Sequence, residues 1–197
     1  MAIGRRAGLF VLAALLAGCA GLWTLSADVW TFGEWPAGRA AGTYAFERLP
    51  SQQSVPQLAD AVEAAARPAL ARAGFRPLAG GAEPDVLVQV AVRSSRHDLA
   101  PWHSTIWWRG GLGPWRYGPW GGPAWSPMRG DFIRYDSEVA VLLRDRATGK
   151  PLYEARASRE DGSAADGATV AAMFEAAMAD FPKTGLNPRQ VTVTLPR

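Results

Sequence analysis

Alternation between apolar and polar side chains is the clearest pattern along this chain, and it predicts β-strands. From Asp85 to Arg93, four valines occupy every second position and share one face, opposite a face that carries Gln89 and Arg93. The same period of two recurs from Ile133 to Leu143. A polar turn at 145–150 then leads to a further alternating segment at 152–159, so the two segments predict a hairpin. Shorter strands are predicted at 20–32, 42–50 and 191–195.

A helical period follows Ser54, which is placed to cap a helix with Gln57 reaching back to complete a capping box. Seven apolar residues then share one face of the predicted helix: Leu58, Val62, Ala65, Ala66, Ala69, Leu70 and Ala73. Gly74 is placed to end this helix, and Pro68 predicts a kink or an early stop within it.

A second amphipathic helix is predicted from Val170 to Phe181, closed by Pro182. The order of elements fits an α+β fold, an antiparallel sheet with its two helices packed on one face. We expect a single domain over 43–197, because 197 residues with 48% apolar composition can bury one sizeable core. Residues 100–131 form a long Gly- and Trp-rich insertion between two strands of this domain, and 19–42 supply its N-terminal strand and linker.

The first residues have the pattern of a cleaved leader. Arg5 and Arg6 precede an apolar run at 9–16, which is too short to cross a hydrocarbon core of about 30 Å. Residues 1–18 therefore predict a signal peptide. The tetrapeptide ending at Cys19 resembles the bacterial lipobox, which implies a diacylglycerol on the Cys19 sulfur and a membrane anchor. An ordinary signal peptide with an incidental cysteine is the alternative.

Cys19 is the single cysteine, so a disulfide within one chain is excluded. In proteins with this motif, a residue after the cysteine that is not Asp implies the outer membrane, and here that residue is Ala20. Removal of the leader leaves 19 of the 21 basic residues against 18 acidic ones, a formal charge of +1. This near-neutral balance argues against nucleic acid as a partner.

Candidate catalytic chemistry is sparse. The chain has two histidines, His97 and His103, and no G-x-S-x-G elbow, so we expect no catalytic residue in a Ser-His arrangement. The spacing of His97, Asp98 and His103 fits no known zinc pattern, and we expect neither a metal nor a cofactor. Four carboxylates are interpreted as the polar face of strands and a turn: Glu138, Glu154, Glu160 and Asp161. The alternative, a glycosidase pair of carboxylates distant in sequence, stays open.

Six of the nine tryptophans lie in the segment from Pro101 to Phe132. Three interpretations stay open: a platform that stacks on sugar rings, a membrane-interface anchor assisted by Arg109, Arg116 and Arg129, and a satellite core over the open sheet face. The candidate ligand contacts are Trp107, Trp108, Trp115, Tyr117, Trp120 and Trp125.

Several short motifs occur in the order typical of one family. They are the lipobox at Cys19, Thr43 to Phe46, Pro84 to Val88, the turn from Asp145 to Lys150 with Leu152-Tyr153 after it, and Phe181-Pro182. Together they resemble the uncharacterised bacterial envelope lipoproteins with domain of unknown function 4136. Tyr153 stands where that family often has Trp. The resemblance implies an α+β fold and an envelope location, and it brings no established activity.

These observations predict a non-enzymatic lipoprotein, anchored by Cys19 to the outer membrane and facing the periplasm, that serves as a structural or interaction module. Its partners would be the membrane, through the lipid, and an envelope protein or glycan. The alternative is a lipoprotein that binds glycan, peptidoglycan or lipopolysaccharide through the Trp-rich loop. A hydrolase whose site is not visible in the sequence is a third class.

Overall fold

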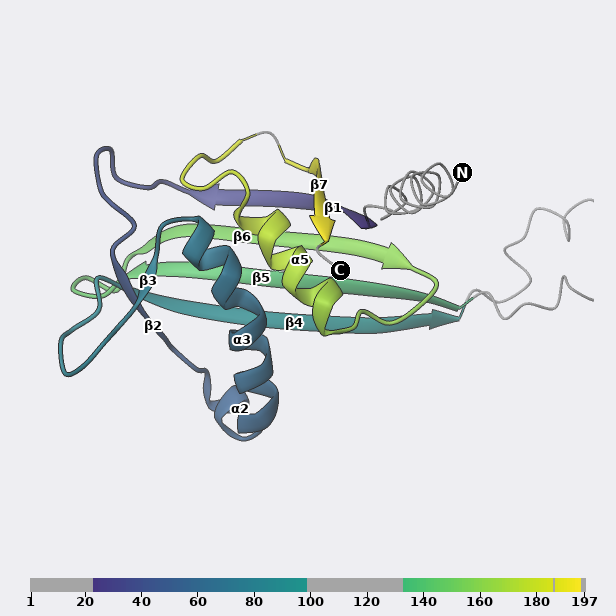
Figure 1. The fold of residues 1–197 in the computed structure, drawn as a ribbon, viewed down its shortest axis with the longest axis horizontal. Helices are drawn as coiled ribbons and strands as arrows, with labels where there is room; N and C mark the ends of the chain where they lie inside the picture. The colour runs from purple at the N-terminus through teal and green to yellow at the C-terminus, as the bar shows by residue number, and fades with distance from the viewer. Residues whose placement is uncertain (1–22, 99–132, 186, 196–197) are drawn as a thin grey trace, which may run out of the picture.

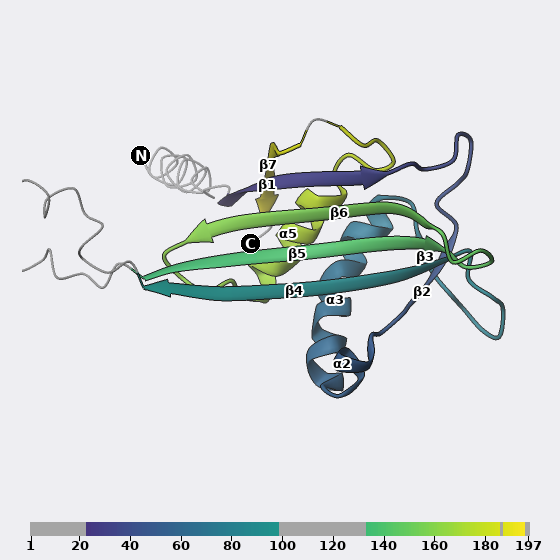
Figure 2. The ribbon, with the colours of Figure 1, turned by 180° about the vertical axis from the view of Figure 1, so that it is seen from behind.

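The computed structural model describes residues 23–98, 133–185 and 187–195, and these form an α+β fold. Seven strands make one sheet in the order β3-β2-β4-β5-β6-β1-β7. Figure 1 shows the helices in front of this sheet, and Figure 2, turned by 180°, shows the opposite face with no described helix over it. The predicted α+β class is therefore confirmed, with the helices on one face.

Strands form where the alternating pattern predicted them, although their ends differ by a few residues. They are β1 (Trp23–Gly33), β2 (Thr43–Phe46), β3 (Arg76–Pro77), β4 (Val86–Asp98), β5 (Ile133–Asp145), β6 (Pro151–Asp161) and β7 (Arg189–Leu195). β4 and β5 pair antiparallel over their whole length, and β5 and β6 form the predicted hairpin. The two-residue β3 was not predicted, because it is too short to show a period.

The sheet is mixed, which corrects the prediction of a purely antiparallel one. β2 pairs parallel with β4, from Tyr44↔Val86 to Phe46↔Val88, and parallel with β3. Parallel pairing follows from the path of the chain, because helix α3 (Pro56–Arg72) lies between β2 and β4 and returns the chain to the end where β2 began.

Helix α3 continues through Pro68 to Arg72, so the predicted early stop at this proline is wrong. The proline lies on the exposed side of the helix. Its end is as predicted: Gly74 adopts a φ of +91°, the Phe75 N–H donates to Leu70 O at 3.0 Å, and the Gly74 N–H donates to Ala71 O at 3.0 Å. These two hydrogen bonds form a Schellman motif, which favours glycine at the left-handed position.

The predicted capping box at Ser54 and Gln57 is wrong, because a separate short helix, α2 (Pro50–Gln53), precedes α3. Ser54 ends α2, and its hydroxyl donates to Ser51 O at 2.7 Å. The last helix, α5 (Gly167–Met178), begins at Asp166, whose carboxylate accepts from the Thr169 N–H at 2.8 Å. It ends before Phe181-Pro182, earlier than predicted.

The core lies between the sheet and the two long helices. Alternate residues of β1, β4, β5 and β6 point toward α3 and α5 and are almost fully buried, as are Leu70 on α3 and Phe174 on α5. Aromatic rings close one end of this core: Phe181 lies 4.8 Å from Trp35, 5.0 Å from Phe75 and 5.2 Å from Tyr153, centroid to centroid.

Ion pairs and hydrogen bonds tie the segment before β2 to the rest of the sheet. Arg39 Nη1 lies 2.7 Å from Asp145 Oδ2, and Arg39 also donates to the carbonyl of Asp85 at 3.1 Å. The Asp85 carboxylate accepts from both the N–H and the hydroxyl of Thr43 at 2.7 Å. We call Arg39, Thr43, Asp85 and Asp145 the end clamp.

The predicted signal peptide and the insertion at 100–131 both lie outside the described residues. Within the part of the chain that the structure describes, no helix is long and apolar enough to cross a bilayer.

Candidate functional site

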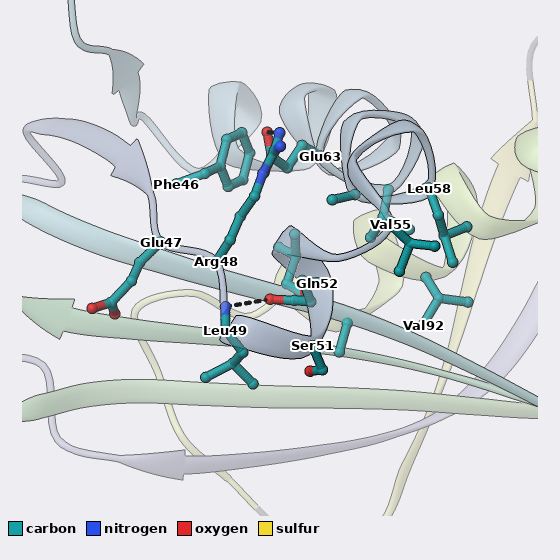
Figure 3. A pocket seen from close by; sticks show the side chains of 14 residues that line it. Phe46, Glu47, Arg48, Leu49, Ser51, Gln52, Val55, Leu58, Glu63 and Val92 are labelled. Atoms are coloured by element: carbon teal, nitrogen blue, oxygen red, sulfur yellow. Dashed lines mark hydrogen bonds and ion pairs between the residues drawn. The ribbon is translucent and has the colours of Figure 1, made fainter.

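A groove of about 300 Å³ opens between the edge of the sheet and the helices. β2 ends at Phe46, and the following residues 47–49 leave the sheet to form one wall. Helix α2 and the first turns of α3 form the other walls, and residues 90–92 of β4 form the floor. Figure 3 shows the side chains that surround this apolar groove, with Leu58 and Val55 on one side and Leu49 across from them.

A glutamine fixes α2 against the sheet. The Gln52 side chain accepts from the Leu49 N–H at 2.9 Å, the contact drawn in Figure 3, and donates to the carbonyl of Val90 at 2.7 Å. Immediately after β2, the Glu47 N–H donates a hydrogen bond to Val88 O at 2.9 Å. These three bonds set the position of the groove's walls relative to β4.

A charged cluster forms the wall toward α3. Arg48 donates through Nε and Nη2 to the two oxygens of Glu63, at 2.5 and 2.9 Å, and through Nη2 to Asp60 at 2.6 Å. Glu63 is only 7% exposed, so this two-pronged contact supplies the partners that a buried carboxylate requires. The hydrogen bonds that Arg48 donates to Glu63 and Asp60 raise the pKa of Arg48. The cluster holds the wall in place.

Apolar side chains are unusually exposed around the groove. Among the described residues, four large hydrophobic side chains are exposed, and three of them line it: Leu49 at 49%, Val55 at 51% and Leu58 at 62%. Exposed apolar residues scattered singly are ordinary, whereas a cluster in a concave surface is typical of a binding site. The groove therefore offers an exposed apolar surface that can accept an apolar side chain.

Leu58 was predicted to lie on the buried face of its helix, and the structure corrects this. The residues further along the same stripe, Ala66, Ala69 and Leu70, are buried beneath α3 as predicted. Leu58 lies in the first turn of α3, past the part of the helix that packs in the core. The apolar stripe of α3 is longer than the sheet that covers it, and this extra length was the sequence signal for the exposed Leu58. The pattern alone does not show where the sheet ends.

The open face of the sheet carries a second hollow of about 510 Å³. Trp30 and Phe32 border it from β1, together with Glu138, Glu154 and Arg156. Arg156 Nη2 lies 2.7 Å from Glu154 and Nη1 lies 4.0 Å from Glu138. Glu138, Glu154 and Glu160 line hollows on this open face, in agreement with their interpretation as polar faces of strands.

The structure places few of the residues singled out from the sequence. Cys19, His103 and the Trp-rich set from Trp107 to Trp125 lie outside the described residues. His97 lies at the far end of β4, more than half exposed, with Nε2 2.8 Å from Asp136 Oδ2. No group of three or more potential metal ligands occurs within residues 23–98, 133–185 and 187–195.

Comparison with known proteins gives a family but no activity. A family model described as "Domain of unknown function (DUF4136)" matches residues 29–183. No curated protein matches the chain.

Solved structures with a similar fold are distant in sequence. The chain is similar to a PDZ domain protein from Parabacteroides distasonis, with 12% identity, a TM-score of 0.50 and coverage of 87% of this chain and 38% of that one. It is also similar to two dodecamer structures of PelC from Paraburkholderia phytofirmans, at 11% and 14% identity and a TM-score of 0.40. These cover 77% of this chain and 92% and 93% of theirs. At such identities the likeness concerns the fold alone.

The matched range begins within β1, includes α2, α3, the groove and the end clamp, and ends just after α5. The protein therefore belongs to the DUF4136 family.

Proposed function

We propose that this protein is an envelope lipoprotein, anchored to the outer membrane by lipid on Cys19, whose domain is a non-enzymatic interaction module that holds a partner protein in the groove. The observation that carries the interaction role is the cluster of Leu49, Val55 and Leu58 around a concave surface. The fixed walls of the groove support this role, because a preformed site loses little conformational freedom on binding.

The anchor rests on the lipobox that ends at Cys19 and on the absence of any other cysteine in the chain. The attached acyl chains together would hold the protein stably, whereas one chain alone binds a bilayer weakly. β1 begins at Trp23, and the four residues from Cys19 to Trp23 extend over at most about 14 Å. This short tether would keep the domain at the periplasmic surface of the membrane.

The anchor is tested by cell fractionation of a Cys19→Ser variant, which removes the only thiol that can accept lipid. We expect the variant to move from the outer-membrane fraction to the periplasmic fraction. Ala20→Ser serves as the control and should remain in the outer membrane, because it preserves the cysteine. A Cys19→Ser protein that stays in the outer-membrane fraction would show that lipid on Cys19 is not the anchor.

The groove is tested with a photo-crosslinking amino acid placed at Leu58 in intact cells. The matched control places it at Ala64, an exposed residue of the same helix that does not line the groove. We expect one identified envelope protein to be captured from position 58 and not from 64, and capture to be lost when Val55→Glu is added. Equal capture from both positions, or none, would exclude the groove as the interaction site.

Glycan binding is a second candidate, and the hollow beside Trp30 favours it. The exposed ring of Phe32 lies next to Trp30, with two carboxylates and a guanidinium beside them, and flat rings with polar neighbours suit sugar rings. We expect Trp30→Ala to reduce retention of the protein on purified peptidoglycan. If the Trp-rich segment also contributes, the double variant Trp115→Ala and Trp120→Ala should reduce retention as well. Unchanged retention in both variants would remove this candidate.

A further inference from the structure

The N-terminal tether and the Trp-rich segment leave the described domain at the same end of the sheet. β1 begins at Trp23, four residues after Cys19, and residues 99–132 join the end of β4 at Asp98 to the start of β5 at Ile133. Figure 1 shows that β1 begins at the end of the sheet where β4 ends and β5 begins. We call this end, defined by Trp23, Asp98 and Ile133, the tether end.

The strand registers show how closely these three positions correspond. Asp98 pairs directly with Ile133. Continuing the registers of β6 with β5 and with β1 places Ile133 level with Trp23. β1 and β4 are separated by β6 and β5, so three strand spacings of about 4.8 Å place Trp23 about 14 Å from Asp98 across the sheet. The tether and both ends of the Trp-rich segment are therefore neighbours.

The end clamp lies at the opposite end of the sheet. β5 runs from Ile133 to Asp145 over 13 residues, so at about 3.3 Å per residue the two ends are about 40 Å apart. A lipid on Cys19 would hold Trp23 within about 14 Å of the bilayer, because four residues extend no further. The tether end is therefore the part of the domain that the anchor brings to the membrane.

The open face of the sheet beside the tether end is polar on the described strands β4, β5 and β6. The side chains that point away from the helices there are Ser95, His97, Arg134, Asp136, Ser158 and Glu160. Arg134 lies 2.8 Å from Glu160, and His97 lies 2.8 Å from Asp136, so much of the charge is compensated within the face. This surface offers little apolar area against which the six tryptophans of the adjoining segment could pack.

A bilayer interface suits the composition of that segment. Tryptophan and tyrosine are enriched where a membrane meets water. The segment also has three arginines, Arg109, Arg116 and Arg129, against the single acidic residue Asp131. A basic residue near an anionic lipid surface gains about 1 kcal/mol. Composition thus indicates a lipid surface at the tether end, independently of the lipobox at Cys19.

We propose that the tether end rests on the anionic phospholipid headgroups of the outer membrane, with the strands directed away from the bilayer and the end clamp turned toward the periplasm. This inference rests on the proposed lipid anchor and adds the orientation of the domain and the lipid surface that it contacts. The groove then opens sideways, since Val92 in its floor lies about 20 Å along β4 from Asp98, at about 3.3 Å per residue.

The test measures which positions lie near the headgroups in the lipidated mature protein. The protein is placed in vesicles of phosphatidylethanolamine and phosphatidylglycerol that carry a nitroxide quencher on the headgroup. Lipid occupies the only native thiol, so an introduced cysteine alone takes up a fluorescent thiol label. Thr24→Cys reports the start of β1, His97→Cys the end of β4, Ala147→Cys the turn beside the end clamp, and Ala64→Cys the exposed side of α3.

We expect the label to lose fluorescence at positions 24 and 97 and to keep it at 64 and 147. Equal quenching at 97 and 147 would show that the domain has no fixed orientation, and quenching at 64 as strong as at 97 would show that it lies on its helices. Either result would overturn the proposal.

Lipid charge gives a second readout. In vesicles of phosphatidylcholine alone, quenching at 97 should decrease while quenching at 24 is kept, because the attraction of basic residues to anionic headgroups is lost and the tether is not. Equal quenching at 97 in both kinds of vesicle would overturn the assignment of an anionic lipid surface.

The parent protein without an added cysteine separates this inference from the anchor itself. We expect it to take up no label. Label uptake would show that the Cys19 thiol is free, in which case the proposed lipid anchor fails. If the parent protein stays unlabelled and position 97 is not quenched, the anchor stands and only the proposed orientation is wrong.

Discussion

Within the described part of the chain, Tyr153 is the largest side chain that is fully buried, and its hydroxyl has no hydrogen-bond partner there. Burial raises the pKa of this phenol, with Asp180 adding to the effect. The Tyr153 ring stabilises the aromatic end of the core, because it packs edge-on against Phe181 with 5.2 Å between the ring centroids. The hydroxyl costs free energy, since it leaves water without gaining a bond.

Tyr153→Phe is therefore expected to preserve the free energy of unfolding or to increase it by about 1 kcal/mol. Tyr153→Ala, which also removes the ring, should lower it by about 3–5 kcal/mol. Urea unfolding followed by tryptophan fluorescence measures both variants. A Tyr153→Phe protein less stable than the parent by about 1 kcal/mol or more would mean that the hydroxyl has a bonding partner.

At the scale of elements, α3 tolerates a residue that usually ends a helix. Pro68 has no N–H to donate to the carbonyl of Ala64, and its ring crowds that carbonyl, yet the helix continues to Arg72. Packing of Ala66, Ala69 and Leu70 against the core maintains the helix on both sides of the proline.

Pro68→Ala should restore the missing bond and raise the free energy of unfolding by about 1–2 kcal/mol, less than the full helix penalty because alanine also makes the unfolded chain more flexible. Chemical denaturation checks the value. Gln57→Ala, another exposed position of α3, is the control and should change stability by less than about 0.5 kcal/mol. Destabilisation by Pro68→Ala would contradict the assignment of strain to this residue.

The sequence predicted those elements whose period matches their burial, such as β4, whose Val86, Val88 and Val90 are buried in the core with Val92 partly buried against it. It did not predict α2, because four residues cannot display a helical period. The sequence pattern also could not predict the direction of β2, because parallel pairing depends on where α3 returns the chain. The groove was missed because Leu58 has the spacing of a buried residue, and the sequence does not show that the first turn of α3 leaves this side chain exposed beside the groove.

At the scale of the whole molecule, the end clamp joins three parts of the chain that are distant in sequence. Arg39 precedes β2, Asp85 precedes β4, and Asp145 ends β5. Hydrogen bonds from Arg39 and then from Thr148 lower the pKa of Asp145 to about 2. Three of the four residues of the end clamp, Thr43, Asp85 and Asp145, belong to the motifs that carry the family resemblance, so part of that signature serves to hold one end of the sheet together.

The clamp predicts a loss of stability in acid. Because the folded-state pKa of Asp145 is below its unfolded value, its contribution is complete above about pH 4 and disappears as the pH falls toward 2. Asp145→Asn should therefore lower the Tm near neutral pH, and the difference from the parent should shrink between about pH 5 and about pH 2. A difference that stays constant over this range, measured by calorimetry, would contradict the ionic role. Asp28→Asn, an exposed carboxylate in the middle of β1, is the control.

The place of β1 in the sheet also has a mechanical consequence. β1 lies between β6 and β7, and its first described residue, Trp23, pairs with Leu195 at the other end of the chain. In a protein tethered at Cys19, a pull from the membrane would act along the axis of β1. The ladder to β7, from Trp23 to Val29, would then be sheared as a unit instead of being unzipped one bond at a time. The tethered end would thus be the strong point of the domain under tension.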